Sequence, residues 1–127
     1  MNYGFSKTVD MSYEAAVEKV TAELKKEGFG VLTSIDVKDT LKKKIDVDFK
    51  KYMILGACNP PLAHKALTNE EELGLLLPCN VIVYEKDNDT VVSIFNPMIM
   101  TEIVDNENLT PIAREVKVRM ERVLEAV

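Results

Sequence analysis

The sequence predicts one α+β domain over residues 1–127, with helices packed against a β-sheet. Three observations support this fold class. Apolar segments with strand-like alternation are interspersed with segments whose apolar residues recur at helical spacing. The length of 127 residues fits a single domain, and no linker or internal repeat divides it. The composition, 46% hydrophobic and 29% charged, is typical of a globular protein.

The first segments of the chain predict a strand followed by a helix. Residues 1–9 form a weakly alternating strand. The helix has Ser12 as its N-cap and continues through Lys26, with apolar residues at helical spacing. Gly28 then stands where a left-handed C-cap is expected, because glycine adopts positive φ without steric cost.

The next segments predict two strands separated by a short helix. Residues 30–37 alternate cleanly and predict a half-buried strand. Its buried face is expected to carry Val31, Thr33, Ile35 and Val37. Residues 38–45 are long enough for two helical turns, with apolar residues four apart. Residues 51–58 predict a mostly apolar strand, in which Gly56 permits a bend or a close backbone approach.

A helix that begins with two prolines follows that strand. Asn59 is its expected N-cap, and Pro60 and Pro61 occupy first-turn positions whose amides have no intrahelical partner. This helix is expected to run to about Glu71.

The C-terminal third predicts a hairpin and a final helix. Residues 79–86 and 90–96 flank Asp87-Asn88-Asp89, the composition of a hairpin turn. Thr110-Pro111 begins the last helix. Its apolar stripe consists of Ile112, Val116, Met120, Val123 and Val127.

The charge balance and the N-terminal sequence argue against some classes of protein. The chain has 21 Asp and Glu against 16 Lys and Arg, which argues against nucleic acid as a partner, because such binding depends mainly on basic contacts to phosphate. The N-terminus lacks the apolar region of a secretory signal, and no apolar run is long enough to cross a bilayer. We therefore expect a cytoplasmic protein without a membrane partner, whose two cysteines are free thiols.

Several segments together resemble the domain of unknown function 302 family. They are "GFGVLTSIDVKDTLKKKIDVDFKKYMILGACNPPLAHKAL", "ELGLLLPCNVIVYE" and "TVVSIFNP", within a resemblance that spans about residues 5–127. The most specific parts are Gly56-x-Cys58-x-Pro60 and Leu77-Pro78-Cys79. The resemblance implies a two-layer domain with a mostly antiparallel sheet and helices on one face. The implied topology is that of the TATA-binding protein, β-α-β4-α with inserted helices, in a homodimer. It implies no activity.

The topology decides whether the two cysteines can share a site. In a parallel crossover, Cys58 at the end of one strand and Cys79 at the start of the next would lie roughly 20 Å apart, at opposite edges of the sheet. In the antiparallel order that the resemblance implies, both lie at the same edge. The candidate ligand-binding residues at that edge are Cys58, Asn59, Cys79 and Asn80.

Two kinds of chemistry are open to these residues. Cys58 precedes a helix N-terminus, whose free amides stabilise a thiolate, so Cys58 is the candidate catalytic nucleophile. Cys58, Cys79 and His64 would instead suit a zinc ion with one open position. His64 falls beside the apolar stripe of its helix, which favours a partly solvated surface position. His64 is therefore a poorer candidate ligand than the two cysteines.

Three functional hypotheses remain open on the sequence. The leading one is a small homodimeric cytoplasmic binding module with a pocket for a small ligand or metal at the Cys58/Cys79 edge. The second is a thiol-dependent redox enzyme in which Cys58 attacks and Cys79 resolves the disulfide. The third is an interaction domain whose cysteines only pack, as free cysteines often do.

Overall fold

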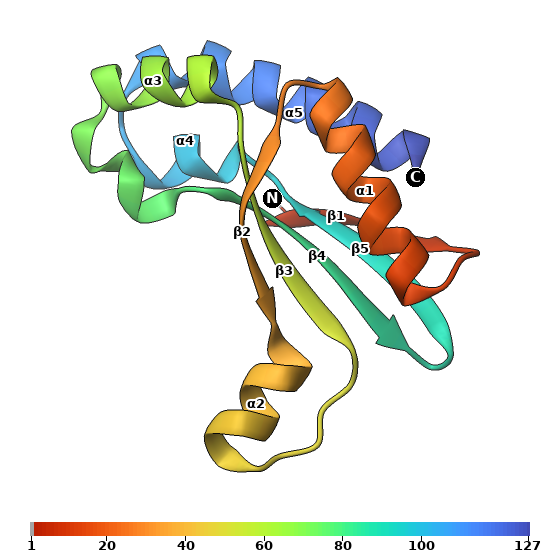
Figure 1. Cartoon of the computed structure of the whole chain (residues 1–127). Helices are drawn as coiled ribbons and strands as arrows, with labels where there is room; N and C mark the ends of the chain where they lie inside the picture. The colour runs from red at the N-terminus through yellow and green to blue at the C-terminus, as the bar shows by residue number, and fades with distance from the viewer. Residues whose placement is uncertain (1) are drawn as a thin grey trace.

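Five antiparallel strands form one open sheet in the computed structural model, which describes residues 2–127 (Figure 1). Their order across the sheet is β1-β5-β4-β3-β2. The strands are β1 (Gly4–Val9), β2 (Gly30–Asp36), β3 (Tyr52–Cys58), β4 (Cys79–Lys86) and β5 (Asp89–Phe95). Every neighbouring pair runs antiparallel. This confirms the α+β class and the β-α-β4-α order with inserted helices.

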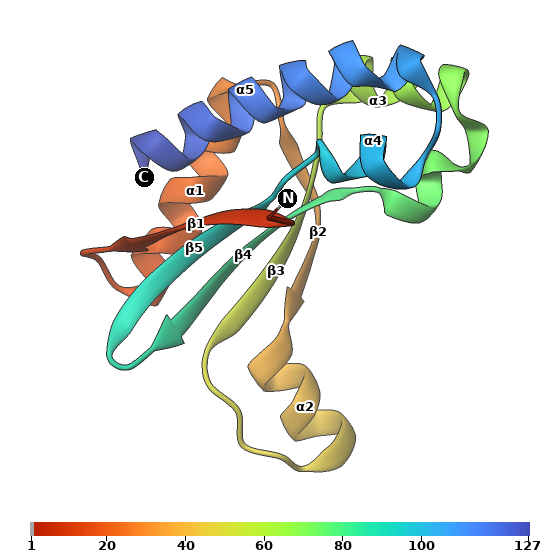
Figure 2. The ribbon, with the colours of Figure 1, turned by 180° about the vertical axis from the view of Figure 1, so that it is seen from behind.

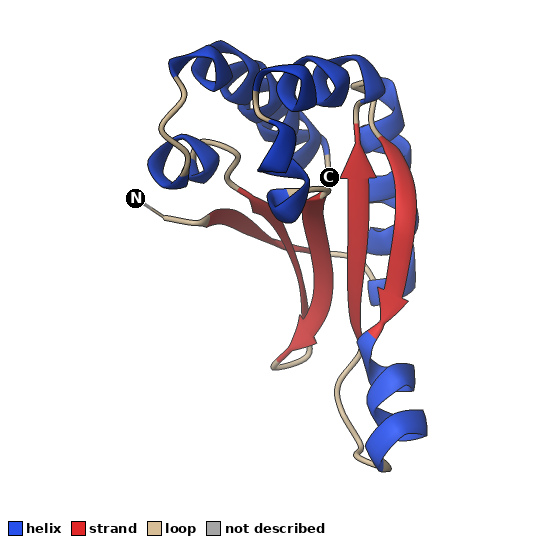
Figure 3. Ribbon diagram, turned by 90° about the vertical axis from the view of Figure 1, so that its left-hand side faces the viewer, coloured by secondary structure: helices blue, strands red, loops and turns tan. Residues whose placement is uncertain are grey.

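The helices divide between one face and the two ends of the sheet. Core contacts place α1 and α5 on the same sheet face, and the opposite face is left uncovered (Figure 2). The segments α3, η1 and α4 gather at one end, and α2 projects from the other (Figures 1 and 3). The helices are α1 (Tyr13–Lys26), α2 (Val37–Ile45), α3 (Pro60–Asn69), α4 (Ile99–Ile103) and α5 (Thr110–Ala126). Two 3-10 helices, η1 (Glu71–Leu76) and η2 (Glu107–Leu109), connect them.

The main core lies between the covered sheet face and α1 with α5. The expected stripes are confirmed, since Leu24 of α1 and Met120 of α5 are completely buried. They meet alternate residues of the central strands, such as Val81 and Val83, which are also completely buried. Burying a side chain of this size contributes about 1.5–3 kcal/mol. The two-residue period of the strands therefore fixes which sheet face carries the core.

The predicted caps and turns are also confirmed. The Ser12 hydroxyl accepts a hydrogen bond from the Ala15 amide and caps α1. Gly28 follows that helix with a φ of 86°, in the left-handed region. At the tip of the β4–β5 hairpin, Asp87 and Asn88 have φ values of 51° and 69°, as a tight hairpin turn requires.

The strand predicted over residues 30–37 is present as β2, but the prediction of a half-buried face is wrong. The strand β2 is an edge strand along which only Val31 is partly buried, and Val37 belongs to α2. An irregularity between Val31 and Thr33 shifts the pairing with β3 and breaks the expected alternation. After this irregularity Ile35 lies directly opposite Ile54, on the sheet face that no helix covers, so it remains exposed whereas Val31 contacts the core.

The helix expected to reach Glu71 ends at Asn69. The Asn106 side-chain amide donates hydrogen bonds to the Asn69 carbonyl and to the Glu70 carboxylate. Glu70 itself is extended, with a φ of −146°. The chain then enters η1, a segment that the sequence pattern did not predict, and α4 was likewise not predicted. In the part of the chain that the structure describes, no helix has both the length and the apolar character to cross a membrane.

Candidate functional site

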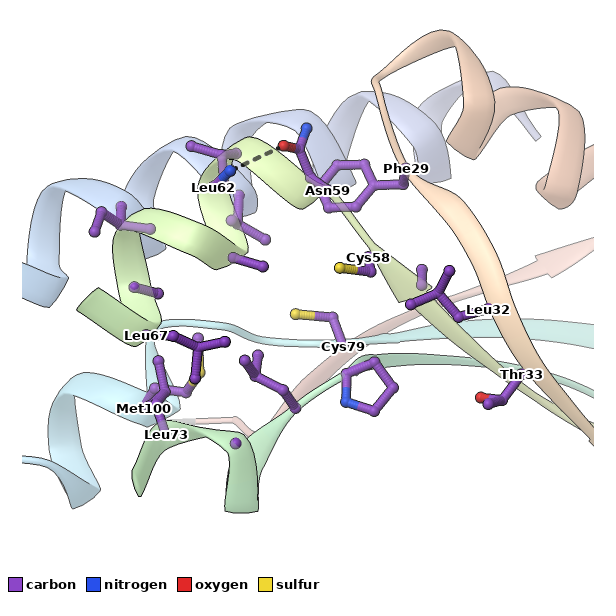
Figure 4. A pocket seen from close by; sticks show the side chains of 18 residues that line it. Phe29, Leu32, Thr33, Cys58, Asn59, Leu62, Leu67, Leu73, Cys79 and Met100 are labelled. Atoms are coloured by element: carbon purple, nitrogen blue, oxygen red, sulfur yellow. Dashed lines mark hydrogen bonds between the residues drawn. The ribbon is translucent and has the colours of Figure 1, made fainter. Parts of the chain in front are cut away.

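A cavity of about 350 Å³ opens at the end of the sheet where α3, η1 and α4 gather (Figure 4). The sheet contributes the ends of β2, β3 and β4 to its wall, and the helices contribute α3, η1, α4 and α5. Its volume lies at the lower end of the range of small-molecule sites. The lining residues are Phe29, Leu32, Thr33, Ala57, Cys58, Asn59, Leu62, Ala63, Ala66, Leu67, Leu73, Gly74, Leu77, Pro78, Cys79, Met100, Ile112 and Val116.

The antiparallel pairing of β3 and β4 brings the two cysteines to this cavity. Cys79 is directly opposite Ala57, the residue before Cys58. The end of β3 therefore meets the beginning of β4, and both thiols line the same space (Figure 4). This excludes the parallel crossover, which would have separated the cysteines.

Gly56 allows three segments to meet beside the cavity. A Cβ atom at this position would overlap the Thr33 side chain and lie 2.8 Å from the Pro78 ring. Only glycine lets β2 and the residue before β4 approach β3 so closely. The close approach expected at Gly56 is confirmed, and it sets the position of two lining residues, Thr33 and Pro78.

Asn59 joins β3 to α3, one of the helices that line the cavity. Its side-chain oxygen accepts a hydrogen bond of 3.1 Å from the Leu62 amide and so caps α3. The two prolines that follow begin the helix without leaving unpaired amides. The Asn59 side chain is buried, and it also packs against the backbone at Gly28. Asn59 thus fixes the angle at which α3 leaves β3.

Replacing Asn59 with alanine is expected to cost about 1 kcal/mol of unfolding free energy, because the cap of α3 is lost. Asn59→Ser is the matched variant, since serine keeps an oxygen that can cap the helix and should recover part of the loss. Urea unfolding of the three proteins measures the difference. Equal stabilities for wild type and Asn59→Ala would contradict a capping role.

The cavity lining is almost entirely apolar. Among residues 2–127, no Asp, Glu, Lys, Arg or His side chain lines it. Thr33 and Asn59 are the polar side chains in the lining apart from the thiols, and the Asn59 oxygen is already occupied by the helix cap. Thr33 is exposed beside Leu32, whose side chain is 67% exposed, so both lie at the open side of the cavity. The inner wall therefore offers contact area but almost no hydrogen-bonding groups.

The environment of Cys79 suppresses its ionisation. Burial raises the pKa of the Cys79 thiol to about 11, with a smaller contribution from the charge that a neighbouring Cys58 thiolate would carry. Cys79 is only 7% exposed and belongs to the main core. At neutral pH it is therefore a protonated thiol, whereas nucleophilic attack and metal binding both use the thiolate. This disfavours a redox mechanism that needs Cys79 as a ready thiolate.

In a Cys58→Ser variant, Cys79 is expected to react with iodoacetamide about 100-fold more slowly at pH 8 than a thiol with a pKa of 9.0. The rate should keep rising with pH up to about 11. Because the pKa is raised in the folded state, ionisation favours unfolding, and the free energy of unfolding should fall as the pH rises from about 9 towards 11. A reaction rate that levels off below pH 9 would contradict the burial effect.

The other predicted site residues lie elsewhere. His64 is exposed on α3 and does not line the cavity. Asn80 is exposed on β4, paired with Gly56, and also lies outside the lining. Within residues 2–127, no three His, Cys, Asp or Glu side chains are grouped so that they could hold a metal ion. The zinc set of Cys58, Cys79 and His64 is therefore not assembled, because the outward phase of His64 on α3 points it to solvent.

Sequence reasoning missed most of the apolar wall. Phe29, Leu73, Met100 and Ile112 line the cavity from four segments that are far apart in the sequence. In the sequence these four residues are distinguished only by being apolar, and ordinary core residues are apolar too. The cysteines could be located because their positions follow from strand order. The positions of these four residues instead depend on how η1, α4 and α5 pack.

Comparison with known proteins gives a family but no activity. The search of curated proteins finds no match. The crystal structure of an uncharacterized conserved DUF302 protein from Bacillus stearothermophilus is similar, with 28% sequence identity and a TM-score of 0.91. The similarity covers 98% of this chain and 97% of the other. The family model for the domain of unknown function DUF302 matches residues 5–127. The chain therefore belongs to the DUF302 family.

Proposed function

We propose that this protein is a small homodimeric binding module whose cavity at the Cys58/Cys79 end of the sheet holds a small, neutral, apolar ligand. The observation that carries the proposal is the lining, in which no charged side chain occurs. The chain's 37 charged side chains (16 basic and 21 acidic) thus all lie outside a cavity of about 350 Å³. We also propose a cytoplasmic location, which the two free cysteines support because structural disulfides occur mainly in oxidising compartments.

Desolvation disfavours a charged ligand in this cavity. A charged group that enters this cavity loses its hydration and finds no counter-ion, so its transfer is strongly unfavourable. An apolar group gains about 0.8 kcal/mol for each methylene that leaves water. The thioether of Met100 and the thiols add polarisable contacts that adapt to different shapes. The cavity therefore favours hydrocarbon over any ionised molecule of the same size.

The dimeric part of the proposal rests on an apolar projection formed by β2, α2 and the following loop. Its exposed apolar residues are Leu32, Ile35, Ile45, Val47 and Phe49. Ile45 is 62% exposed, and α2 buries none of its residues. The strand β2 is also an unpaired edge without lysine or proline, the features that usually protect an edge. A second copy would cover this surface and reach the cavity mouth through Leu32.

Sedimentation equilibrium tests the dimer separately. The wild-type protein is expected to be dimeric, and Ile45→Glu, which lies outside the cavity lining, is expected to shift it towards monomer. A wild-type protein that stays monomeric at high concentration would refute the dimer without affecting the ligand proposal.

Three probes with the same hydrocarbon chain test the ligand class. Octan-1-ol is expected to bind, whereas octanoate and octylammonium are expected to bind at least about ten-fold more weakly, because the cavity offers no partner for either charge. Isothermal titration calorimetry at neutral pH measures all three. Tighter binding of either ion than of octan-1-ol would refute a neutral ligand, and failure of all three to bind would refute the apolar pocket.

A further inference from the structure

We propose that the uncovered face of the sheet carries a second binding site, for a small planar aromatic anion such as a nucleoside monophosphate. The site is built from residues that the apolar cavity does not use, so the inference stands independently of the proposed function. It lies over β1, β5, β4 and β3, on the face opposite to α1 (Figure 2).

The alternation of the strands places this site on the open face. Val81 and Val83 of β4 point into the main core, so Ile82 and Tyr84 point to the other side. Tyr84 is directly opposite Tyr52, and Ile82 is directly opposite Ser93. Together they border a surface cavity of about 520 Å³. Its lining residues are Asn2, Tyr3, Gly4, Ser6, Lys50, Tyr52, Ile82, Tyr84, Lys86 and Ser93.

The aromatic part of the site is a pair of stacked tyrosines. The Tyr52 and Tyr84 rings have centroids 5.3 Å apart and an interplanar angle of 17°. Tyr3 borders the same cavity from the N-terminal segment, and its side chain is 80% exposed. A cross-strand pair of aromatic residues contributes to sheet stability, which accounts for Tyr52 and Tyr84 as a pair. It does not account for the exposed Tyr3, which an incoming planar ring would cover.

The charged side chains around this cavity are positive, although the chain as a whole is negative. The formal net charge is −5, yet in the described part of the chain two lysines and no Asp or Glu line the cavity. Neither Lys50 nor Lys86 has an acidic partner within salt-bridge distance in residues 2–127, whereas Lys51 is paired with Glu14. The Lys50 ammonium lies 5.0 Å from the centre of the Tyr84 ring. A positive group therefore stands next to the aromatic surface.

Hydroxyl groups complete the set of polar contacts. The Ser6 and Ser93 hydroxyls lie 2.8 Å apart across β1 and β5, and both border the cavity. The Ser93 hydroxyl also donates to the Phe5 carbonyl, at 3.4 Å, so both hydroxyl protons are used within the sheet. The hydroxyl oxygens keep free lone pairs that can accept a hydrogen bond from a ligand N–H or O–H. The site thus combines a surface for ring stacking, ammonium groups for an anion and hydroxyls for a polar ligand edge.

The size of the site favours a mononucleotide over a nucleic acid strand. Two ammonium groups suit a single phosphate, whereas nucleic-acid affinity depends on many basic contacts along the backbone. The acidic balance of the chain would repel the remaining phosphates of a strand. A ring packed against the exposed Tyr3, beside the stacked pair, with its phosphate at Lys50 and Lys86, fits the chemistry of the lining.

Titration with adenosine 5′-monophosphate tests the proposal, followed by NMR of tyrosine-labelled protein. Three of the chain's four tyrosines border the site, and the fourth, Tyr13, is buried in the main core and serves as an internal control. Ring signals of Tyr3, Tyr52 and Tyr84 are expected to shift with saturation while those of Tyr13 remain. Adenosine and ribose 5-phosphate should each bind more weakly than the complete nucleotide.

Two exposed substitutions, which should not affect folding, test the roles of the side chains. Tyr3→Ala and Lys86→Ala are each expected to weaken binding about two- to five-fold, and Lys44→Ala on α2 is the matched control without effect. The proposal is overturned if inorganic phosphate binds as well as the nucleotide, if no tyrosine signal shifts, or if Lys44→Ala weakens binding as much as Lys86→Ala. A mixed-sequence oligonucleotide that binds far more tightly than the mononucleotide would also overturn it.

Discussion

Replacing Ala63 with leucine is expected to weaken octan-1-ol binding about 50-fold. Ala63 is a half-buried residue of α3 that lines the apolar cavity. The larger side chain adds three carbon atoms to the space that the ligand would occupy. If each displaced carbon removes about 0.8 kcal/mol of apolar transfer energy, the ligand loses about 2.4 kcal/mol. Calorimetric titration of the variant measures this loss directly.

The same variant should not destabilise the protein, because the new side chain enters the empty space of the cavity rather than displacing packed atoms. Thermal unfolding without ligand therefore serves as the companion measurement. Ala15→Leu, on the exposed surface of α1, is the matched control and should bind octan-1-ol like the wild type. Unchanged affinity in Ala63→Leu would show that the ligand binds elsewhere.

Gly56→Ala is expected to lower the free energy of unfolding by about 1–3 kcal/mol, the cost of overpacking a site with no spare room. The new methyl group would overlap the Thr33 side chain and press on the Pro78 ring. Both residues border the cavity, so ligand affinity should fall together with stability. Urea unfolding and calorimetric titration of the same preparation measure the two effects.

Gly30→Ala is the control for this substitution. Gly30 is also in a strand, but a Cβ there meets no atom within 4 Å, so the stability should change by less than about 0.5 kcal/mol. A double variant, Gly56→Ala with Thr33→Ala, should recover part of the loss because the overlapping hydroxyl is removed. If Gly56→Ala and Gly30→Ala behaved alike, the close approach of β2 to β3 would not be the cause.

The part of the site that could be predicted from the sequence is the part that depends on strand order. Cys58 ends one apolar segment and Cys79 begins the next, and an antiparallel sheet brings such ends together. The cap at Asn59 and the close approach at Gly56 could also be predicted, because both follow from the local chemistry of single residues. The resemblance to a known family supplied the choice between parallel and antiparallel order.

Other features depend on tertiary packing, which local patterns do not contain. The alternation of residues 30–37 predicted a buried strand face, but the pairing irregularity between Val31 and Thr33 places Ile35 on the uncovered face of the sheet. The soft side chains of Cys58, Cys79 and His64 suggested a metal site, yet His64 lies on the outer side of α3. The cavity wall formed by Leu73 and Met100 required knowledge of how η1 and α4 pack together at the end of the sheet.

The dependence of affinity on chain length tests the central claim most directly. In a series of 1-alkanols from butan-1-ol upwards, each added methylene is expected to tighten binding about four-fold, the equivalent of about 0.8 kcal/mol. The increase should stop once the cavity of about 350 Å³ is full. Such a rise followed by a plateau, with the plateau reached at a shorter chain length in Ala63→Leu, would support an apolar site of limited size. An affinity that does not change with chain length, or that rises without limit in both proteins, would contradict it.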